Sequence, residues 1–301
     1  MLHTHHTPAS RRRHFREQLA SGRLLRIPGA INPYSARLIQ EAGFDAAYLS
    51  GAVMAADLGL PDIGLTTSTE IAARAQQVTR VTDLPVLIDA DTGFGEPMNA
   101  ARTLQLLEDA GLAGLHLEDQ VNPKRCGHLD GKTVVAREEM VRRLRSVVEA
   151  RRDPDFLVMA RTDARSVEGL GAAIDRAKAY VDAGADAIFP EALADEAEFE
   201  AFRRAVDVPL LANMTEFGKS RLLDAATLEN LGYNIALYPV TFFRLAMGAI
   251  EDGLHTLAAE GTQESLLPRM QTRSRLYEVL GYEEYNTFDS AVFNFTLPPG
   301  N

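Results

Sequence analysis

A short pattern occurs four times along this chain, and it limits the possible folds more than any other feature. Each copy places a glycine after a helical segment and continues with a short apolar run: AGFDAAYLS (42–50), AGLAGLHLE (110–118), AGADAIFPE (183–191) and LGYNIALYP (231–239). A glycine directly after a helix is typical of a C-terminal cap. The apolar run that follows predicts a buried strand. The sequence therefore predicts four helix-to-strand junctions.

Four more predicted strands alternate with these. A proline precedes the apolar run in LPVLIDAD (84–91), DPDFLVMARTD (153–163) and VPLLANMTE (208–216), and LLRIPGAI (24–31) completes the set. Amphipathic segments between strands, such as 67–81 and 138–150, have apolar residues three and four positions apart, which predicts helices. Eight strands alternating with helices over about 240 residues favour an α/β fold of the (β/α)8 TIM-barrel type. A doubly wound sheet is the alternative.

The barrel does not account for the whole chain. We expect residues 1–13, including HTHHTPASRRR, to form a disordered tail, residues 14–260 to form the catalytic barrel, and residues 286–301 to form a loose C-terminal tail. Between them, residues 261–285 form a helical extension. A helix over 263–280 has apolar residues on one face after the barrel units are complete, and it needs a partner surface. The chain is therefore expected to self-associate.

Composition narrows the class of protein. The 301 residues have a net charge of -11, which argues against a nucleic-acid surface. The apolar stretches are of strand length, far below the roughly 20 residues of a membrane-spanning helix. A single cysteine excludes an internal disulfide. We expect a cytoplasmic protein that binds a small molecule, and neither nucleic acid nor a membrane.

Polar side chains end most of the predicted strands. They are Ser50, Asp89, Asp91, His116, Glu118, Asp119, Arg161, Asp163, Glu191, Asn213 and Thr215. The active sites of barrel enzymes lie where the strands end, so these residues are candidates for one site. The alternative is a rim of solvated charges.

Asp89 and Asp91 lie two residues apart at one strand end, so strand alternation would point both carboxylates to the same side. Two carboxylates that close raise each other's pKa unless a cation lies between them. Oxygen ligands suit Mg²⁺ or Mn²⁺, with waters completing the octahedron and Glu118 holding one of them. A metal site is predicted, although an isolated Asp-x-Asp also occurs in turns and caps.

The only cysteine lies in a loop of basic residues, glycine and proline, VNPKRCGHLDGK (121–132). A cysteine that merely fills a core usually has apolar neighbours. Lys124 and Arg125 are expected to lower the pKa of Cys126, so that its thiol exchanges a proton near neutral pH. This favours a proton-transfer or nucleophilic role, and the alternative is a solvated cysteine without function.

A resemblance to a known superfamily joins these motifs. KRCGH, with DADTGFG and LHLEDQ before it and MARTDA, FPEA, NMTEFG and MQTRSRLYE after it, resembles the isocitrate lyase and phosphoenolpyruvate mutase superfamily, most closely the 2-methylisocitrate lyases. The similarity extends from about residue 14 to about residue 285. It implies a (β/α)8 barrel whose C-terminal helices swap between the subunits of a homotetramer.

The resemblance also implies a set of site residues. Asp89 and Asp91 would hold Mg²⁺, with Asp62, His116 and Glu118 supporting its waters. The substrate-binding positions fall on Ser50, Gly51, Ala52, Cys126, Gly127, Arg161, Glu191, Asn213, Thr215, Arg244 and Arg273. Ala52 stands where relatives have glycine, and its backbone N–H remains usable if its φ is negative.

The implied activity is cleavage of 2-methylisocitrate to pyruvate and succinate, a step of propionate catabolism, with Cys126 as general acid and arginines that bind the carboxylates. Isocitrate lyases normally contain a long insertion that this chain lacks, and the mutase and hydrolase relatives lack the cysteine motif. Cleavage of isocitrate, dimethylmalate or oxaloacetate is an alternative activity. A metabolite-binding barrel without catalysis is a further alternative.

Overall fold

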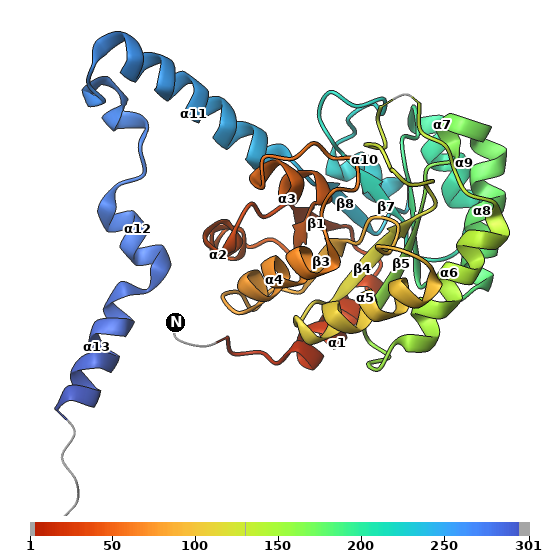
Figure 1. Ribbon diagram of the computed structural model, residues 1–301, viewed down its shortest axis with the longest axis horizontal. Helices are drawn as coiled ribbons and strands as arrows, with labels where there is room; N and C mark the ends of the chain where they lie inside the picture. Colours follow the sequence, from red (N-terminus) through yellow and green to blue (C-terminus); the bar gives the residue numbers. More distant parts are fainter. Residues whose placement is uncertain (1–3, 130, 295–301) are drawn as a thin grey trace, which may run out of the picture.

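The computed structural model describes residues 4–129 and 131–294, and its centre is a ring of eight parallel strands surrounded by helices (Figure 1). The strands are β1 Leu25–Pro28, β2 Ala47–Leu49, β3 Val86–Asp89, β4 Gly114–Glu118, β5 Leu157–Thr162, β6 Ala187–Pro190, β7 Leu211–Asn213 and β8 Ile235–Tyr238. They pair in the orders β2-β3-β4-β5-β6 and β1-β8-β7. Single bridges, Gly29–Tyr48 and Ile188–Leu210, join the two groups into a closed barrel. The predicted (β/α)8 barrel is confirmed.

The first helix precedes the first strand, and the following helices lie between the strands in sequence and outside them in space. They are α1 Pro8–Ala20, α2 Pro33–Glu41, α3 Gly51–Asp57, α4 Ser68–Thr79, α5 Pro97–Asp109, α6 Arg137–Ala150, α7 Arg165–Glu168, α8 Leu170–Asp182, α9 Glu196–Ala205 and α10 Ala225–Asn230. The helices predicted over 67–81 and 138–150 correspond to α4 and α6. The repeated glycines have positive φ at each junction, with values of 75° at Gly43, 83° at Gly111, 103° at Gly184 and 81° at Gly232. This conformation is costly for other residues, so the repeated glycine ends the helix.

Strand alternation separates two apolar cores. In β5, Leu157 and Met159 belong to the cluster inside the barrel, whereas Val158 and Ala160 pack against the surrounding helices. Because side chains alternate along a strand, the next inward position of β5 after Met159 is Arg161. The same alternation places polar side chains above the apolar filling of the barrel, and this arrangement positions the candidate site.

The N-terminal helix corrects one prediction. We expected a disordered tail over 1–13, but α1 begins at Pro8 with Thr7 as its N-cap. Arg12 is buried, and its guanidinium donates to Glu108 O at 2.6 Å and Leu112 O at 2.8 Å and contacts Asp153 at 2.8 Å. Arg12, in this basic run, therefore donates hydrogen bonds to backbone carbonyls at the C-terminal end of α5 and just after it. Residues 1–3 lie outside the described residues.

The C-terminal segment also differs from the prediction. Helix α11 (Thr241–Glu260) leads away from the barrel, although residues up to 260 were assigned to it (Figure 1). The single helix expected over 263–280 is divided into the 3-10 helix η1 (Glu264–Arg269) and α12 (Arg273–Leu280). Pro268 cannot donate a helical hydrogen bond, and Thr272 caps a new helix.

The last described helix, α13, spans Tyr282–Phe293, so the helical extension continues beyond residue 285 into the expected loose tail. The rest of that tail, residues 295–301, lies outside the described residues. Tyr34 in α2 donates to Gln271 at 2.6 Å, which connects the segment to the barrel of the same chain. Within residues 4–129 and 131–294, no helix combines the length and apolar character needed to cross a membrane.

The contacts of Arg12 generate a test of the corrected N-terminus. Replacing Arg12 by methionine keeps the aliphatic stem and removes the charged donors, so we expect a loss of about 2 to 4 kcal/mol in the free energy of unfolding. Urea unfolding followed by circular dichroism measures this change. Arg13→Met is the matched control, because the Arg13 side chain is 71% exposed and should change stability by less than about 0.5 kcal/mol. Equal stability of both variants would contradict the assigned role of Arg12.

Candidate active site

A cavity of about 90 Å³ opens where the barrel strands end. It is lined by many of the predicted site residues, namely Ser50, Ala52, Asp62, Asp89, Cys126, Gly127, Arg161, Glu191, Asn213, Thr215 and Arg244. Of the other predicted residues, Gly51, Asp91, His116 and Glu118 contact this group directly, as described below. We refer to the cavity as the mouth. Residues from distant parts of the sequence therefore meet at one place.

The two aspartates converge, but not through strand alternation alone. Strand β3 ends at Asp89, whose Oδ1 accepts a hydrogen bond from the backbone N–H of Asp91 at 3.0 Å, and Asp91 has a φ of 45°. A side chain at Gly51 would meet both carboxylates, since its Cβ would lie 2.8 Å from Asp89 Oδ2 and 3.3 Å from Asp91 Oδ1. Any other residue at position 51 would displace the Asp89 carboxylate. A turn directs both acids to one point.

The aspartate pair has an unequal protonation tendency. Burial and the neighbouring Asp89 raise the pKa of Asp91 to about 6, against the opposing charge of Lys124. Burial also acts to raise the pKa of Asp89, but nearby positive charges, including Lys124 and Arg161, outweigh it and lower the value. One deprotonated and one easily protonated carboxylate at a shared point form a site that favours additional positive charge.

Lys124 supplies part of that charge, and sequence reasoning did not identify this role. Its ammonium lies 2.8 Å from Asp91 Oδ1 and also donates to Asp62, and its side chain is 3% exposed. The sequence contains an indication of this role. Lys124 lies two residues before Cys126 in the loop at the mouth, so it is close enough to contact the acidic side chains there. The sequence predicts an effect of Lys124 on the thiol, whereas the structure pairs it with Asp62 and Asp91.

His116 lies beneath the aspartates as a neutral ring. Burial lowers the pKa of His116 to about 4, so the imidazole is uncharged at neutral pH. Its Nε2 lies 2.7 Å from the hydroxyl of Tyr48, and its Nδ1 lies 3.8 Å from Asp89 Oδ1. Tyr48, which the sequence analysis did not select, also lines the mouth. The pair can orient a water or a hydroxyl near Asp89.

Arg161 is the centre of the opposite wall. Its guanidinium contacts Glu118 at 3.2 Å, Asp163 at 3.0 Å and Glu191 at 3.1 Å. Burial raises the pKa of Glu118 well above its ordinary range, whereas the charge of Arg161 overcomes burial and lowers the pKa of Glu191. Arg161, which is predicted to bind a substrate carboxylate, is therefore also the counter-ion of three protein carboxylates. Asn213 donates to both oxygens of Glu191, at 3.2 and 3.3 Å.

The loop with Cys126 closes over this wall. A Cβ at Gly127 would lie 2.4 Å from Arg161 Nη2 and 2.5 Å from Glu191 Cγ, so only glycine fits there. His128, another residue that we did not predict, lies 2.9 Å from Glu191 and accepts a hydrogen bond from the N–H of Lys219 at 2.9 Å. The thiol is thereby held at the mouth.

The expected thiol pKa was wrong in direction. Burial raises the pKa of Cys126, and this effect exceeds the opposing influence of the backbone N–H of His128 and the charge of Arg161. Lys124 contacts Asp62 and Asp91 instead of the thiol. A protonated thiol is suited to donate a proton.

The two remaining arginines have different positions. Arg244 lines the mouth, and its guanidinium lies 2.9 Å from Glu216 and 5.3 Å from the ring centre of Phe217. Arg273 is the first residue of α12, is exposed and does not line the mouth. Ala52 lies inside α3, so its backbone has the negative φ that we required. The single chain brings together the predicted residues except Arg273 and Asp119, whose carboxylate accepts hydrogen bonds from Thr162 and from Tyr180 of α8 and does not line the mouth.

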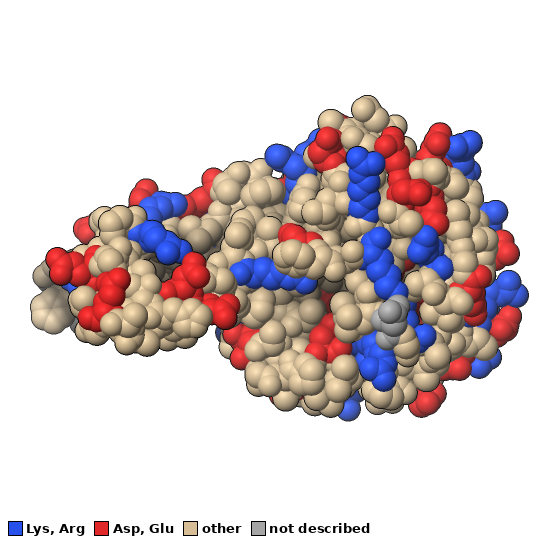
Figure 2. Space-filling model, turned by 90° about the horizontal axis from the view of Figure 1, so that it is seen from above, with Lys and Arg blue, Asp and Glu red and all other residues tan. Residues whose placement is uncertain are grey.

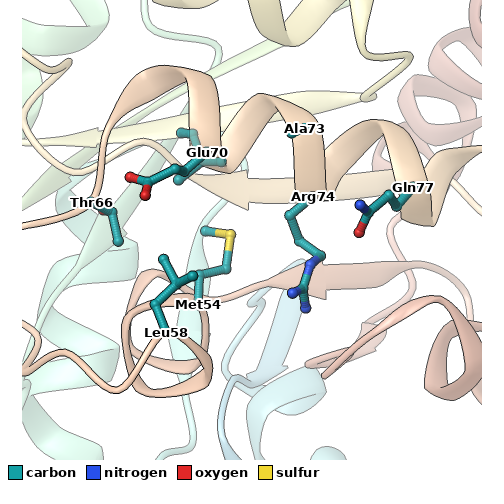
Figure 3. A pocket seen from close by; sticks show the side chains of 8 residues that line it. Met54, Leu58, Thr66, Glu70, Ala73, Arg74 and Gln77 are labelled. Atoms are coloured by element: carbon teal, nitrogen blue, oxygen red, sulfur yellow. The ribbon is translucent and has the colours of Figure 1, made fainter.

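A second cavity, of about 190 Å³, lies between α3 and α4 (Figure 3). Its walls include Met54, Leu58 and Ile71, and none of the predicted site residues lines it. Arg74, one of the two charged residues that line this space in Figure 3, already contacts Asp57 and the carbonyl of Ile31. This cavity lacks the converging acids, cation and thiol of the mouth.

The residues at the mouth fit a divalent cation of the Mg²⁺ type. Among residues 4–129 and 131–294, no three His, Cys, Asp or Glu side chains are close enough to form a complete ligand set. Mg²⁺ needs fewer, because it keeps several waters and binds through one or two carboxylates and the substrate. The space at Gly51 between two buried carboxylates, and the raised pKa of Asp91, match this requirement.

Positive charge is available locally despite the net charge of the chain. Figure 2 shows Lys and Arg side chains across the middle of the barrel face seen from above, with Asp and Glu between and around them. The mouth itself includes Lys124, Arg125, Arg161 and Arg244. Such a site suits a polycarboxylate ligand.

Comparisons with known proteins agree with this chemistry. The sequence profile described as "Phosphoenolpyruvate phosphomutase" matches residues 15–258. "Probable 2-methylisocitrate lyase 2" of Corynebacterium glutamicum is 63% identical, with 96% of this chain and 94% of the relative covered. "2-methylisocitrate lyase" of Escherichia coli is 49% identical, with 90% and 92% covered.

Solved structures show the same architecture. A structure of oxaloacetate acetylhydrolase with 3,3-difluorooxalacetate has a TM-score of 0.90 at 33% identity, covering 97% of this chain and all of the other. A 2,3-dimethylmalate lyase, described as a member of the PEP mutase/isocitrate lyase superfamily, has a TM-score of 0.89 at 33% identity, with 98% and 99% covered. A phosphonopyruvate hydrolase complex with oxalate and Mg²⁺ has a TM-score of 0.85 at 26% identity, with 95% and 99% covered.

The raised pKa of Cys126 predicts how its reactivity depends on pH. Alkylation by iodoacetamide requires the thiolate, which forms only as the pH passes the pKa of the folded protein. The rate should therefore still increase above pH 9, whereas a cysteine in a flexible peptide levels off around its pKa of about 8.5. Mass spectrometry of the alkylated fraction measures both, and the peptide is the control. A plateau below pH 8 would show that the thiol is activated.

Proposed function

Because this chain belongs to the phosphoenolpyruvate phosphomutase family and is a lyase, we propose that its mouth cleaves 2-methylisocitrate to pyruvate and succinate. The observation that carries the proposal is the position of Cys126, whose thiol lines the mouth together with Arg161 and Asp89 and has a pKa that burial raises. The covered length and identity of the relatives support the methylated substrate. Cleavage of oxaloacetate or dimethylmalate, named for two of the solved structures, is the second candidate.

The acidic side of the mouth is proposed to hold the metal and the substrate hydroxyl. Asp89 and Asp91 would bind Mg²⁺, or Mn²⁺ with similar ligand preferences, which lowers the pKa of a hydroxyl and stabilises negative charge on a forming keto acid. Asp62, His116 and Glu118 would orient the waters around it. The Mg²⁺ in the related hydrolase structure supports this assignment.

The opposite side of the mouth is proposed to bind carboxylates and return a proton. Arg161 and Arg244 line the mouth and offer several N–H donors for carboxylate oxygens. When the central carbon–carbon bond breaks, its electron pair remains on the succinate fragment. The Cys126 thiol then gives its proton to that carbon, which completes succinate, and the thiolate regains a proton from solvent. A free thiol with this role is consistent with a reducing compartment, and we assign the enzyme to the cytoplasm.

We also propose that the protein is a homotetramer whose C-terminal helices exchange between subunits. Helix α11 exposes Leu245 at 63%, Ile250 at 52% and Leu254 at 61%, and α13 exposes Phe288 at 55%. Contiguous apolar surface of this kind is typical of an interface. Arg273 would then reach a mouth through contact between subunits. The domain limits follow the same division, with a barrel that ends near the start of α11 and a helical segment that continues to Phe293.

Parallel turnover assays test the substrate. For purified enzyme with Mg²⁺, the kcat/KM for 2-methylisocitrate should be at least about tenfold higher than the kcat/KM for isocitrate. The reason is that one apolar contact with a methyl group is worth about 1 to 3 kcal/mol. Product identification should give pyruvate and succinate. Enzyme treated with EDTA is the control, and it should regain activity when Mg²⁺ is added. Faster cleavage of oxaloacetate or dimethylmalate would replace the proposed substrate, and full activity without metal would exclude the metal role.

Replacing Cys126 by serine tests the proton donor. The hydroxyl has nearly the same size but gives up its proton far less readily, so kcat should fall at least about a hundredfold, as expected when general acid catalysis is lost. The KM should change little because the arginines and the metal bind the carboxylates. Circular dichroism of the variant confirms its fold. Turnover like that of the wild type, or a stable thioester found by mass spectrometry of the wild type, would refute the role.

Light scattering tests the proposed assembly. At micromolar concentration the protein should have the mass of four chains, because the apolar surface of α11 is covered by other subunits. Replacing Leu245 and Leu254 by glutamate should reduce the mass while the barrel remains folded, as judged by circular dichroism. Replacing Leu129 by glutamate is the matched control, because Leu129 is also exposed but lies in the loop that contains Cys126. A wild-type monomer would contradict the proposal.

A further inference from the structure

Lys132 is the last residue of the loop (121–132) that contains Cys126, and its ammonium is buried without lining the mouth. The side chain is 2% exposed, and Nζ donates to Gly127 O at 2.5 Å and to Asp163 Oδ1 at 2.6 Å. Burying an ammonium costs several kcal/mol unless it is paired and hydrogen-bonded. The two acceptors therefore fix the position of this side chain.

Asp163 is a rigid anchor for that ammonium. It lies just beyond β5, is fully buried, and its backbone N–H donates to Asp119 Oδ1 at 2.8 Å. Its carboxylate also accepts two hydrogen bonds from Arg161, at 3.0 and 3.2 Å. One carboxylate thus orients both Lys132 and the guanidinium that forms a wall of the mouth.

Gly127 is the point where this anchor contacts the loop. Its carbonyl accepts from Lys132, and its Cα lies against Arg161 and Glu191 so closely that no Cβ would fit. Gly127 directly follows Cys126, so fixing its carbonyl restricts the position of the thiol. The distance between the thiol and the Arg161 guanidinium then depends on a short chain of contacts through Lys132 and Asp163.

We propose that Lys132 is a positioning residue. It holds the loop that contains Cys126 in its closed conformation and keeps the thiol at a fixed position relative to the Arg161 guanidinium. Two other contacts attach the loop through side chains that line the mouth, Lys124 to Asp62 and His128 to Glu191. Lys132 differs because it holds the main chain beside the thiol. The effect on turnover rests on the function proposed above, but the effect on access to the thiol does not.

The test compares Lys132→Met with the wild type and with Lys178→Met, which removes an exposed lysine on α8. Without substrate, iodoacetamide should alkylate Cys126 in Lys132→Met at least about tenfold faster, the change expected when a hydrogen bond from a charged donor is lost. The direction of the change in the alkylation rate distinguishes two possible roles of Lys132. A purely electrostatic role of Lys132 would slow alkylation, because removing a positive charge raises the pKa of the thiol. With substrate, kcat should fall at least about tenfold while KM stays within about threefold.

Each result decides between positioning and other roles. Faster alkylation with normal turnover of every substrate would support the contact between Lys132 and the loop. It would contradict only the catalytic role proposed for Cys126. Unchanged or slower alkylation in folded Lys132→Met would overturn the proposal. Lys132→Gln, which retains a neutral donor, should give an intermediate alkylation rate. Failure of both variants to fold would also overturn it, because Asp163 keeps Arg161 as its counter-ion and Lys132 is assigned to the loop and not to the core.

Discussion

The positive charge of Arg161 is the condition on which the arrangement of the mouth depends. Glu118, Asp163 and Glu191 are all buried around it, at distances of 3.0 to 3.2 Å. Three carboxylates with one guanidinium leave an excess of negative charge, which explains why burial raises the pKa of Glu118 while the guanidinium lowers that of Glu191. Lys124 in the mouth and Lys132, which contacts Asp163 outside it, add positive charge near these carboxylates. The polar interior is stable only as a connected set.

Much of this arrangement follows from sequence periodicity. The repeated glycine and apolar run predict each helix-to-strand junction, and alternation along β5 places Arg161 inside the barrel above Leu157 and Met159. The residues at the ends of the strands can therefore be assigned to one site from the sequence alone. Asp89 and Asp91 were assigned to a shared point for a partly different reason, since a turn with a positive φ at Asp91 produces their convergence.

The predictions that were wrong depend on contacts between distant segments. A basic run at the N-terminus resembles a solvated tail, and nothing local in the sequence indicates that Arg12 meets carbonyls about a hundred residues away. The thiol of Cys126 has basic neighbours in sequence, but Lys124 turns to Asp62 and Asp91, and burial determines the pKa. Arg273 belongs to a motif at the end of the chain, and its position relative to the mouth depends on how α11 leaves the barrel.

The contacts of α1 also affect the order in which the chain can fold during synthesis. Phe15 belongs to the apolar cluster inside the barrel, and Arg12 reaches Asp153, 141 residues later in the chain. Helix α1 therefore has no acceptors for its buried guanidinium until Glu108 and Leu112 have been synthesised, and the carboxylate partner Asp153 follows only about halfway along the chain. Strand β1 must wait even longer for β8, with which it pairs in the closed ring. Closure of the barrel is consequently a late, long-range event, and the nascent protein exposes its N-terminal apolar surface for most of its synthesis.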